Sequence, residues 1–430
     1  MCNNNASNEG SNRMVKCNSL FQCIYGGQQS FKKIIFAFFM QVSFNNTEIA
    51  FSSQSDSDLR RSYWLFKLVS NPAFVSTGKW LTTIALSLHI PIKWIIKPTI
   101  FKQFCGGETV GESRKKIEEL EKYNIKSILD YSIEGKELEE DFDKCCDEII
   151  SIIREAKLNK SIGFSVFKPS GIASVALLEK ISGEKGLSAL TEIEKKEFDR
   201  VHERFNRICL ASFDANVPVF VDAEESWMQK AVDGLVNEMM KLYNKEKAIV
   251  YNTFQLYRTD RLENLIDCFL HAKNGNYFLG AKLVRGAYME KERARAQKMN
   301  YKSPINNNKE LTDHLYDGAL RFCMSHLDRI SFCCASHNEK SSMLVLDLMS
   351  EKNIHANHPH IYFSQLLGMS DHISYNLASA GYNVSKYVPY GPVRDVIPYL
   401  IRRAQENTSV KGQTGRELSL ILKERERRRN

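Results

Sequence analysis

The residues best suited to chemistry lie on one face of a predicted helix near the C-terminus, which begins just after a turn of Pro and Gly residues. Arg402 and Arg403 lie three and four residues after Tyr399, so the three side chains share one side of the helix. Neighbouring guanidinium groups repel each other unless an anion lies between them, and arginine pairs well with carboxylates and phosphates. This face therefore predicts an anion site. Spacing alone leaves open a second interpretation, in which both arginines are surface charges paired with Glu406 and Asp395.

The elements that would position this helix alternate regularly along the chain. Apolar, β-branched runs of strand length are separated by segments with helical periodicity. Continuously apolar strands joined by helices indicate a parallel sheet buried on both faces, and eight such units fit a closed (β/α)8 barrel of the TIM type. An open doubly wound sheet is the alternative, but the chain has no GxGxxG after the first run and no GxxxxGK[ST] motif. The predicted strands are 127–133, 162–168, 217–223, 248–255, 278–285, 331–336, 360–366 and 384–388.

A barrel of this type carries its chemistry at the carboxyl ends of the strands. Those ends are polar or charged: Asp130, Lys168, Asp222, Gln255, Lys282, Arg285, Tyr288, His337, Asn338, Gln365 and Tyr387. Lys168 and Asp222 interrupt apolar runs, which random polarity does not readily explain. We expect Asp222 to compensate the charge of Lys168 and to orient it.

Convergence of these ends would gather positive charge in one cavity. The cations are Lys168, Lys282, Arg285, Arg402 and Arg403. A partly desolvated site tolerates so much charge only when anions bind, and a small carboxylate together with a pyrophosphate would balance it. The tyrosines Tyr288, Tyr387 and Tyr399 would add flat apolar walls suited to a small ring or an isoalloxazine.

Five motifs in order along the chain resemble the proline dehydrogenase family in its eukaryotic, mitochondrial form. They are Val-Phe-Val-Asp-Ala-Glu-Glu, Ala-Lys-Leu-Val-Arg-Gly-Ala-Tyr, Ala-Ser-His-Asn-Glu, Tyr-Phe-Ser-Gln-Leu-Leu-Gly-Met-Ser-Asp, and Lys-Tyr-Val-Pro-Tyr-Gly-Pro followed by Tyr-Leu-Ile-Arg-Arg-Ala-Gln-Glu-Asn. The likeness spans about residues 101–407, and the order of the motifs makes it far more specific than any one of them. It implies a distorted (β/α)8 barrel that binds FAD.

The resemblance also implies roles for individual residues. The carboxylate of L-proline would be bound by Lys168, Arg402 and Arg403, and its ring by Tyr288, Tyr387 and Tyr399. The residues with a catalytic part would be Asp222, Lys282 and Lys168, with Lys282 near the reactive N5 edge of the flavin. FAD would be met by Ala223, Gln255, Lys282, Arg285, Gly286, Ala287, Ser336, His337, Asn338 and Glu406. The reaction would transfer a hydride from proline C5 to flavin N5 and yield Δ1-pyrroline-5-carboxylate.

The family further implies ubiquinone as electron acceptor and a peripheral position on the matrix side of the mitochondrial inner membrane. Residues 1–55 are expected to be disordered or to be a transit segment that is removed. They contain few acids, as transit segments do, but only one arginine where such segments usually have several. An aromatic helical arm is expected over 56–124, the catalytic barrel over 125–407 and a basic tail over 408–430, of which residues 423–429 are expected to be solvated. The segment 172–196 matches the family poorly and predicts a flexible loop.

Other classes of function are disfavoured by composition. The net charge is +8, but basic residues are interleaved with acids, so we expect no nucleic-acid partner. Eleven cysteines without a CxxC motif indicate reduced thiols. The run 355–360 contains three histidines but favours a polar loop over a metal site. Two alternatives remain open: a Schiff-base lyase or aldolase that uses Lys168, and a catalytically silent flavin-binding barrel.

Overall fold

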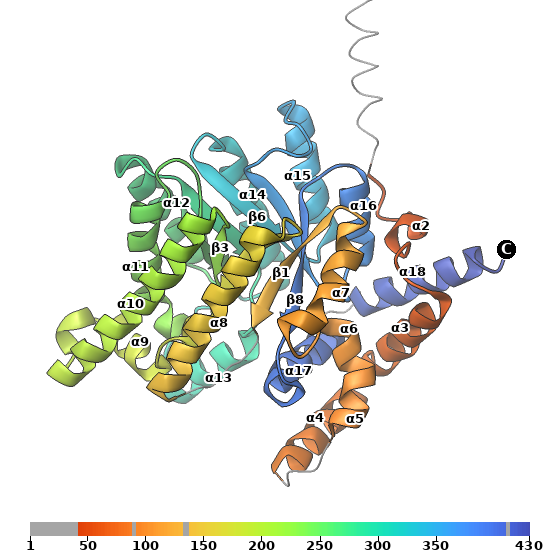
Figure 1. Cartoon of the computed structure of the whole chain (residues 1–430), viewed down its shortest axis with the longest axis horizontal. Helices are drawn as coiled ribbons and strands as arrows, with labels where there is room; N and C mark the ends of the chain where they lie inside the picture. Colours follow the sequence, from red (N-terminus) through yellow and green to blue (C-terminus); the bar gives the residue numbers. More distant parts are fainter. Residues whose placement is uncertain (1–41, 88–91, 132–136, 410–412) are drawn as a thin grey trace, which may run out of the picture. The chain divides into compact units, whose positions relative to one another are not determined.

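Eight parallel strands, paired in chain order, close into a barrel. The computed structural model describes residues 42–87, 92–131, 137–409 and 413–430, and the chain from Phe44 onward forms one unit (Figure 1). The barrel confirms the predicted fold class and excludes the open doubly wound sheet. The strands are β1 Ile125–Tyr131, β2 Ile162–Phe167, β3 Val219–Val221, β4 Val250–Gln255, β5 Leu279–Val284, β6 Ile330–Ala335, β7 Ile361–Leu366 and β8 Val384–Tyr390.

Every predicted strand is present and differs from the observed one only at its ends. The largest difference is in β3, which is three residues long. Backbone bonds to β2 nevertheless continue on both sides of it, from Ser165 N to Pro218 O and from Asp222 N to Phe167 O, both at 2.9 Å. The backbone of Asp222 is therefore fixed to the barrel although it follows the strand.

Aromatic side chains fill the interior of the barrel. Phe164 and Phe220 stack with their ring centroids 4.3 Å apart, and Tyr251 and Tyr362 contact Phe164 edge to face. Offset-stacked and edge-to-face pairs are the geometries that aromatic rings prefer. This packed layer makes the barrel a solid core, and Tyr387 of β8 belongs to the same cluster.

Helices follow the strands in the expected alternation. The helices of the barrel are α8 Glu139–Leu158, α9 Val175–Ser182, α10 Glu192–Ala215, α11 Ser226–Tyr243, α12 Arg261–Asn274, α13 Met289–Met299, α14 Lys309–Ser325, α15 Glu339–Glu351, α16 Asp371–Ser379 and α17 Val393–Ser409. The remaining helices are α2 Thr47–Ala50, α3 Asp56–Val69, α4 Pro72–Ser87, α5 Lys93–Ile96, the π-helical turn η1 Lys97–Phe101, α6 Lys102–Phe104, α7 Val110–Glu121 and α18 Gln413–Arg427. Two 3₁₀ turns, η2 Pro169–Gly171 and η3 Gly186–Ala189, lie between β2 and α10.

The last barrel helix does not occupy its regular place. In a regular (β/α)8 barrel the helix after the eighth strand covers the outside of the first and last strands. Here α7 packs on β1 and β8, while α17 packs on α3, α4, α5 and η1 (Figure 1). The barrel is thus distorted, as the family resemblance implies, and α17 is free to take another position.

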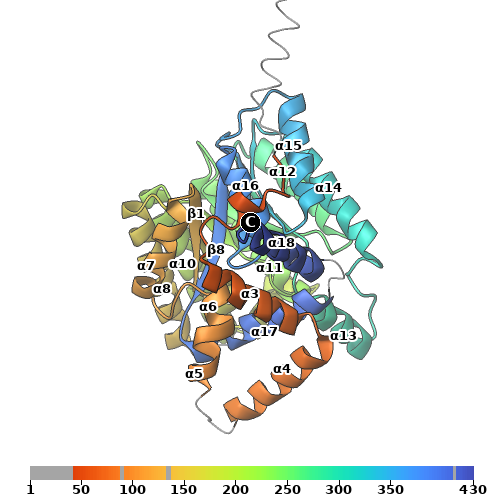
Figure 2. The same cartoon turned by 90° about the vertical axis from the view of Figure 1, so that its right-hand side faces the viewer.

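The N-terminal arm and the C-terminal helix pack together beside α17 (Figure 2). Phe66 of α3 and Leu420 and Ile421 of α18 are buried in one cluster with Ala404 of α17. Burial of large apolar side chains is the main driving force for such docking. The arm and α18 therefore hold α17 in place.

Two expectations about the less regular segments are wrong. Residues 42–55 are not disordered, because α2 forms and Phe51 is buried; residues 1–41 lie outside the described part of the chain. The segment 172–196 is not a flexible loop, since α9 is capped by Ser174 and packs on α11. Residues 423–429 are largely exposed, as expected, although Glu424 is buried; the preceding part of α18 buries Glu417, Leu420 and Ile421. In the two segments that differ from expectation, burial of a few apolar side chains decides the outcome.

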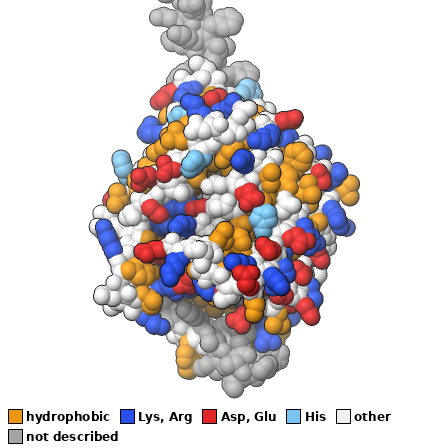
Figure 3. Space-filling view, turned by 90° about the vertical axis from the view of Figure 1, so that its left-hand side faces the viewer, with side chains coloured by type: hydrophobic (Ala, Val, Ile, Leu, Met, Phe, Trp, Pro, Cys, Tyr) orange, Lys and Arg blue, Asp and Glu red, His pale blue; other side chains and the backbone are white. Residues whose placement is uncertain are grey.

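The surface and the thiols agree with the composition. Basic and acidic side chains are interspersed on the face shown in Figure 3. Within the described ranges, no helix has the length and apolar character needed to cross a bilayer. The eight cysteines that lie there are buried and form no disulfide.

Candidate active site

A buried cation and a buried phenol meet a partly exposed carboxylate at the carboxyl end of the barrel. Lys282 of β5 donates to Oδ1 of Asp222 at 2.6 Å and also bonds to the hydroxyl of Tyr387 on β8. The Tyr387 hydroxyl in turn donates to the same oxygen of Asp222 at 3.0 Å. Nζ of Lys282 lies 4.4 Å from the centroid of the Tyr387 ring and 5.4 Å from that of Phe220. Burial and the charge of Asp222 raise the pKa of Tyr387 well above its ordinary value, so the phenol stays protonated and can donate.

Lys168 has a different partner from the one that the sequence suggested. Its Nζ lies 2.9 and 3.0 Å from the two oxygens of Asp130, and both side chains are buried. The expectation that Asp222 compensates Lys168 is therefore wrong, because Asp222 is engaged by Lys282. Adjacent strands β1 and β2 bring Asp130 and Lys168 together.

Arg285, just after β5, is held by three side chains. Its Nε donates to Asp313 at 2.7 Å, and its two terminal nitrogens donate to the hydroxyls of Ser336 at 2.8 Å and Ser341 at 3.0 Å. The guanidinium also lies 4.2 Å from the ring centroid of Tyr316. A rigid, stacked guanidinium is suited to binding phosphate. Asp130 and Asp313 each pair with one of the expected cations, Lys168 and Arg285. The carboxyl end of the barrel therefore carries less uncompensated positive charge than the sequence implied.

The backbone after Arg285 requires glycine. Gly286 has φ +131°, and a Cβ at this position would lie 2.5 Å from the ring of Tyr257. Ala287 follows on the exposed turn. On the neighbouring strand end, Nε2 of Gln255 donates to the carbonyl of Ala223 at 3.4 Å.

Helix α17 brings its two arginines against tyrosines. The guanidinium of Arg402 lies 5.7 Å from the ring centroid of Tyr288, and that of Arg403 lies 5.2 Å from that of Tyr399. Arg403 is only 6% exposed, which contradicts the interpretation of both arginines as surface charges. The side chain of Glu406 lies outside the described residues.

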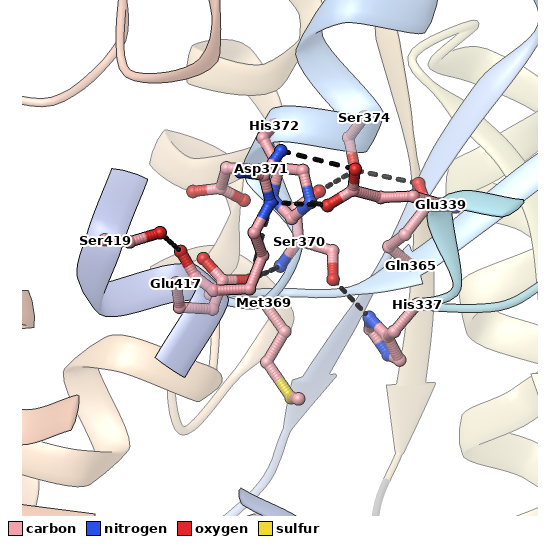
Figure 4. Close-up of polar contacts among 12 residues, drawn as sticks. His337, Glu339, Gln365, Met369, Ser370, Asp371, His372, Ser374, Glu417 and Ser419 are labelled. Carbon is pink, nitrogen blue, oxygen red and sulfur yellow. Dashed lines mark hydrogen bonds and ion pairs between the residues drawn. The ribbon is translucent and has the colours of Figure 1, made fainter. Parts of the chain in front are cut away.

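His337 follows β6 and faces the same region as α17. Burial lowers the pKa of His337 well below its ordinary value, and the nearby positive charges of Lys386 and Arg403 lower it further. The ring is therefore neutral at physiological pH. Its Nδ1 lies 3.0 Å from the hydroxyl of Ser370 (Figure 4), and the next residue, Asn338, caps α15.

The sequence model of the proline dehydrogenase family matches residues 113–416. The chain is 34% identical to "Proline dehydrogenase 1, mitochondrial" of Dictyostelium discoideum, with 89% of this chain and 74% of that protein covered. The chain belongs to the proline dehydrogenase family. It is also 32% identical to "Proline dehydrogenase 2, mitochondrial" of Arabidopsis thaliana, with 88% of this chain and 89% of that protein covered. As a family member it is an oxidoreductase, with the activity that the family name states.

A solved structure has the same fold. Proline utilization A (PutA) from Bdellovibrio bacteriovorus, inactivated by N-propargylglycine, superposes with a TM-score of 0.64 at 16% identity. The match covers 84% of this chain and 38% of the PutA chain. The two proteins therefore share the fold of the barrel.

The Schiff-base alternative finds no support in this proline dehydrogenase fold. A lysine nucleophile must be neutral, and such lysines are activated by apolar surroundings or by another cation. Lys168 instead lies within 3.0 Å of both oxygens of the Asp130 carboxylate, so its amine is in neither kind of surroundings.

Two groups at the site were not identified from the sequence. Lys386 of β8 is fully buried, and its Nζ donates to the carbonyl of Met369 at 2.6 Å and to Asp371 at 2.7 Å. A lysine inside an apolar strand is the signal that singled out Lys168, so Lys386 could have been found in the same way. Glu417, 3% exposed on α18, gave no such signal because an acid beside an arginine in an amphipathic helix usually lies on the exposed side.

Proposed function

We propose that the chain oxidises L-proline to Δ1-pyrroline-5-carboxylate with FAD as its cofactor, in the mitochondrion. The observation that carries this proposal is the position of α17. It lies where the guanidinium of Arg402 is 5.7 Å from the ring centroid of Tyr288, shortly after β5, so one helix brings two arginines to the ends of the strands. A clamp for a small carboxylate and a polar strand-end surface thus occupy one site.

The strand ends fit a flavin dinucleotide. The side-chain oxygen Oε1 of Gln255 is buried without a hydrogen-bond partner, so a bound donor would satisfy it. Arg285, backed by the Ser336 hydroxyl, and the positive φ of Gly286 form a cradle of the kind that binds phosphate. We assign the flavin to Ala223, Gln255, Lys282, Arg285, Gly286, Ala287, Ser336, His337, Asn338 and Glu406. When bound, FAD supplies the hydride acceptor.

The protein's own part is to bind and orient proline. Arg402 and Arg403, assisted by Lys168, would bind the carboxylate of proline, while Tyr288, Tyr387 and Tyr399 enclose the ring. Fixing the carboxylate determines which ring carbon faces the cofactor, and such positioning can supply much of the rate. Asp222 and Tyr387 hold the ammonium of Lys282 in one place, so the positive charge at the site does not have to reorganise during the reaction.

The test is the visible spectrum of the purified protein under anaerobic conditions. We expect bound FAD, whose oxidised bands disappear on addition of L-proline. Pyrrolidine, which has the ring and the nitrogen but no carboxylate, is the matched control and should bleach the flavin far more slowly. Oxidised bands that persist with proline would contradict the substrate assignment. A colourless protein that borohydride traps with a carbonyl compound would instead support the Schiff-base alternative.

We further propose that the arm contacts the inner membrane from the matrix side and that ubiquinone accepts the electrons. Trp80 of α4 and Trp94 of α5 are 63% and 73% exposed, and Trp64, Phe74 and Ile95 are also exposed. Exposed apolar groups gathered on one part of a surface indicate an interaction site. The mitochondrial names of the two relatives and the acid-poor N-terminal segment support this location.

Experiments with lipid vesicles test the membrane contact separately from the oxidation of proline. Replacement of Trp80 and Trp94 by Ser should abolish co-sedimentation with vesicles that contain anionic lipid, and should slow reoxidation by ubiquinone held in those vesicles. Reduction of a soluble acceptor should be unchanged. Ile193→Ser, which removes an exposed apolar residue from α10, is the control. If the tryptophan variants still bind and reduce the vesicle quinone, the arm has no such role.

A further inference from the structure

The loop between β7 and α16 contains a residue in an uncommon conformation. Ser370 has φ +52°, in the left-handed region that side chains other than Gly, Asn and Asp rarely adopt. It stands at the N-cap of α16, yet its side chain caps no N–H of the helix. Serine at this position usually has an extended backbone and accepts a bond from the second or third N–H. Strain of this kind persists only where surrounding contacts impose it, and it often marks a functional site.

The Ser370 hydroxyl is directed to His337 instead. It lies 3.0 Å from Nδ1 of that ring (Figure 4). A hydroxyl can donate to a bare Nδ1 or accept from a protonated one, so the bond fixes the orientation of the ring with either tautomer. The Ser370 side chain thus bonds to His337 and not to an N–H of the helix that it precedes.

The C-terminal helix holds Ser370 in this conformation. The carboxylate of Glu417 on α18 is buried and accepts the N–H of Ser370 at 2.6 Å. A buried carboxylate is costly unless hydrogen bonds compensate it. Its neighbour His372, whose Nδ1 lies 3.8 Å away, is bonded through Nε2 to Glu339 at 3.0 Å. Arg416, one residue before Glu417, donates to the same oxygen of Glu339 at 2.7 Å.

A side chain of strand β8 fixes the loop as well. Lys386 donates to the carbonyls of Leu366 and Met369, at 3.3 and 2.6 Å. Arg416 connects α18 with Glu339, two residues beyond His337, while the contacts of Ser370 connect α18 with the His337 ring itself. The connection runs from Glu417 through the backbone and hydroxyl of one residue to the His337 ring.

We infer that Glu417 is a positioning residue of the cofactor site: through Ser370, the C-terminal helix sets the orientation of the His337 ring. This inference rests on the proposed function, which assigns His337 to the flavin. It gives α18 a role beyond packing. We call the contacts from Glu417 through Ser370 to His337 the relay. It needs an acceptor for the Ser370 N–H but no charge, so a glutamine at position 417 should hold Ser370 in the same way.

The test compares variants of the full-length, FAD-loaded enzyme. Glu417→Ala and Ser370→Ala should each weaken FAD binding roughly tenfold, the scale expected when the group that orients a direct ligand is removed. They should also shift the flavin absorption bands. Glu417→Gln should restore both properties nearly to wild type. FAD affinity is measured by flavin fluorescence during reloading of the deflavinated protein.

A matched control separates positioning from helix docking. Glu424 lies on the same helix, is buried, and pairs with Arg427 and Arg428 away from the relay. Glu424→Ala should lower the melting temperature without changing FAD affinity or the flavin bands. Equal loss of FAD affinity in Glu424→Ala and Glu417→Ala would overturn the inference. So would unchanged FAD affinity and unchanged bands in Ser370→Ala, a variant that keeps the Glu417 contact and should fold. A wild-type protein that binds no FAD would refute the proposed function before any variant is made.

Discussion

The buried pair of Lys282 and Asp222 should show strong energetic coupling. The Lys282 side chain is 7% exposed, and Asp222 supplies the carboxylate that neutralises it at 2.6 Å. Removing one member of a buried ion pair typically costs about 3–5 kcal/mol, because the other charge stays buried without compensation. For Asp222→Asn we expect about 3 kcal/mol, at the low end, since the amide and Tyr387 can still accept from the ammonium.

Replacement of the lysine should destabilise the protein less than replacement of the aspartate. In Lys282→Met the carboxylate of Asp222 keeps the bond from Tyr387 at 3.0 Å, and its side chain is 15% exposed, so we expect a loss of about 2 kcal/mol. The double variant has no buried charge left at the pair and should also lose about 2 kcal/mol. Independent effects would add to about 5 kcal/mol, so the expected coupling is about 3 kcal/mol.

The assay is urea unfolding of the FAD-loaded protein, followed by tryptophan fluorescence and by flavin release. Activity cannot report the coupling, because all three variants should lose proline-dependent flavin reduction. The exposed pair of Arg207 and Asp147 is the control, and its coupling should not exceed about 1 kcal/mol. Losses at Lys282 and Asp222 that add within about 0.5 kcal/mol would refute the reasoning.

Two further predictions concern single residues. Arg403→Lys should raise KM for proline more than tenfold and also lower kcat, because lysine cannot form the paired hydrogen bonds of a buried guanidinium; steady-state kinetics with an unchanged KM would contradict its role at the carboxylate. Burial raises the pKa of Glu224 from 4.5 to about 7. Between these values the folded protein binds a proton that the unfolded chain has lost, so stability should fall as pH rises from about 4.5 to 7. Glu224→Gln should make the melting temperature less dependent on pH across this range. If the melting temperatures of the two proteins change with pH in the same way, Glu224 is not the group responsible.

The barrel could be predicted because its signal is local and repeated. Each strand is a run of apolar, β-branched residues buried on both faces, and each is followed by a helix with its own periodicity. The positions of charged residues at strand ends follow from the same pattern. Lys168, Asp222, Lys282 and Arg285 are therefore all found at the predicted end of the barrel.

The partners of those charges could not be predicted in the same way. Asp222 and Lys168 lie on neighbouring strands, which made them the natural pair in the sequence. In the closed barrel Lys282 of β5 reaches Asp222, and Asp130 of β1 takes Lys168. Pairing depends on the stagger of the strands and on rotamers, neither of which a linear pattern contains. The same reason hides Glu417, which looks like a surface acid until the helix that carries it is seen to dock.

The displacement of α17 explains why segments outside the barrel belong to the site. A helix on the flank of the barrel could not bring Arg402 and Arg403 to the strand ends. Because α7 occupies the flank on β1 and β8, α17 packs on the arm and on α18 instead. In the proposed function, both of these elements have to be in place for the arginines to reach the substrate. We therefore expect loss of the arm or of the C-terminal helix to affect proline binding before it affects the barrel.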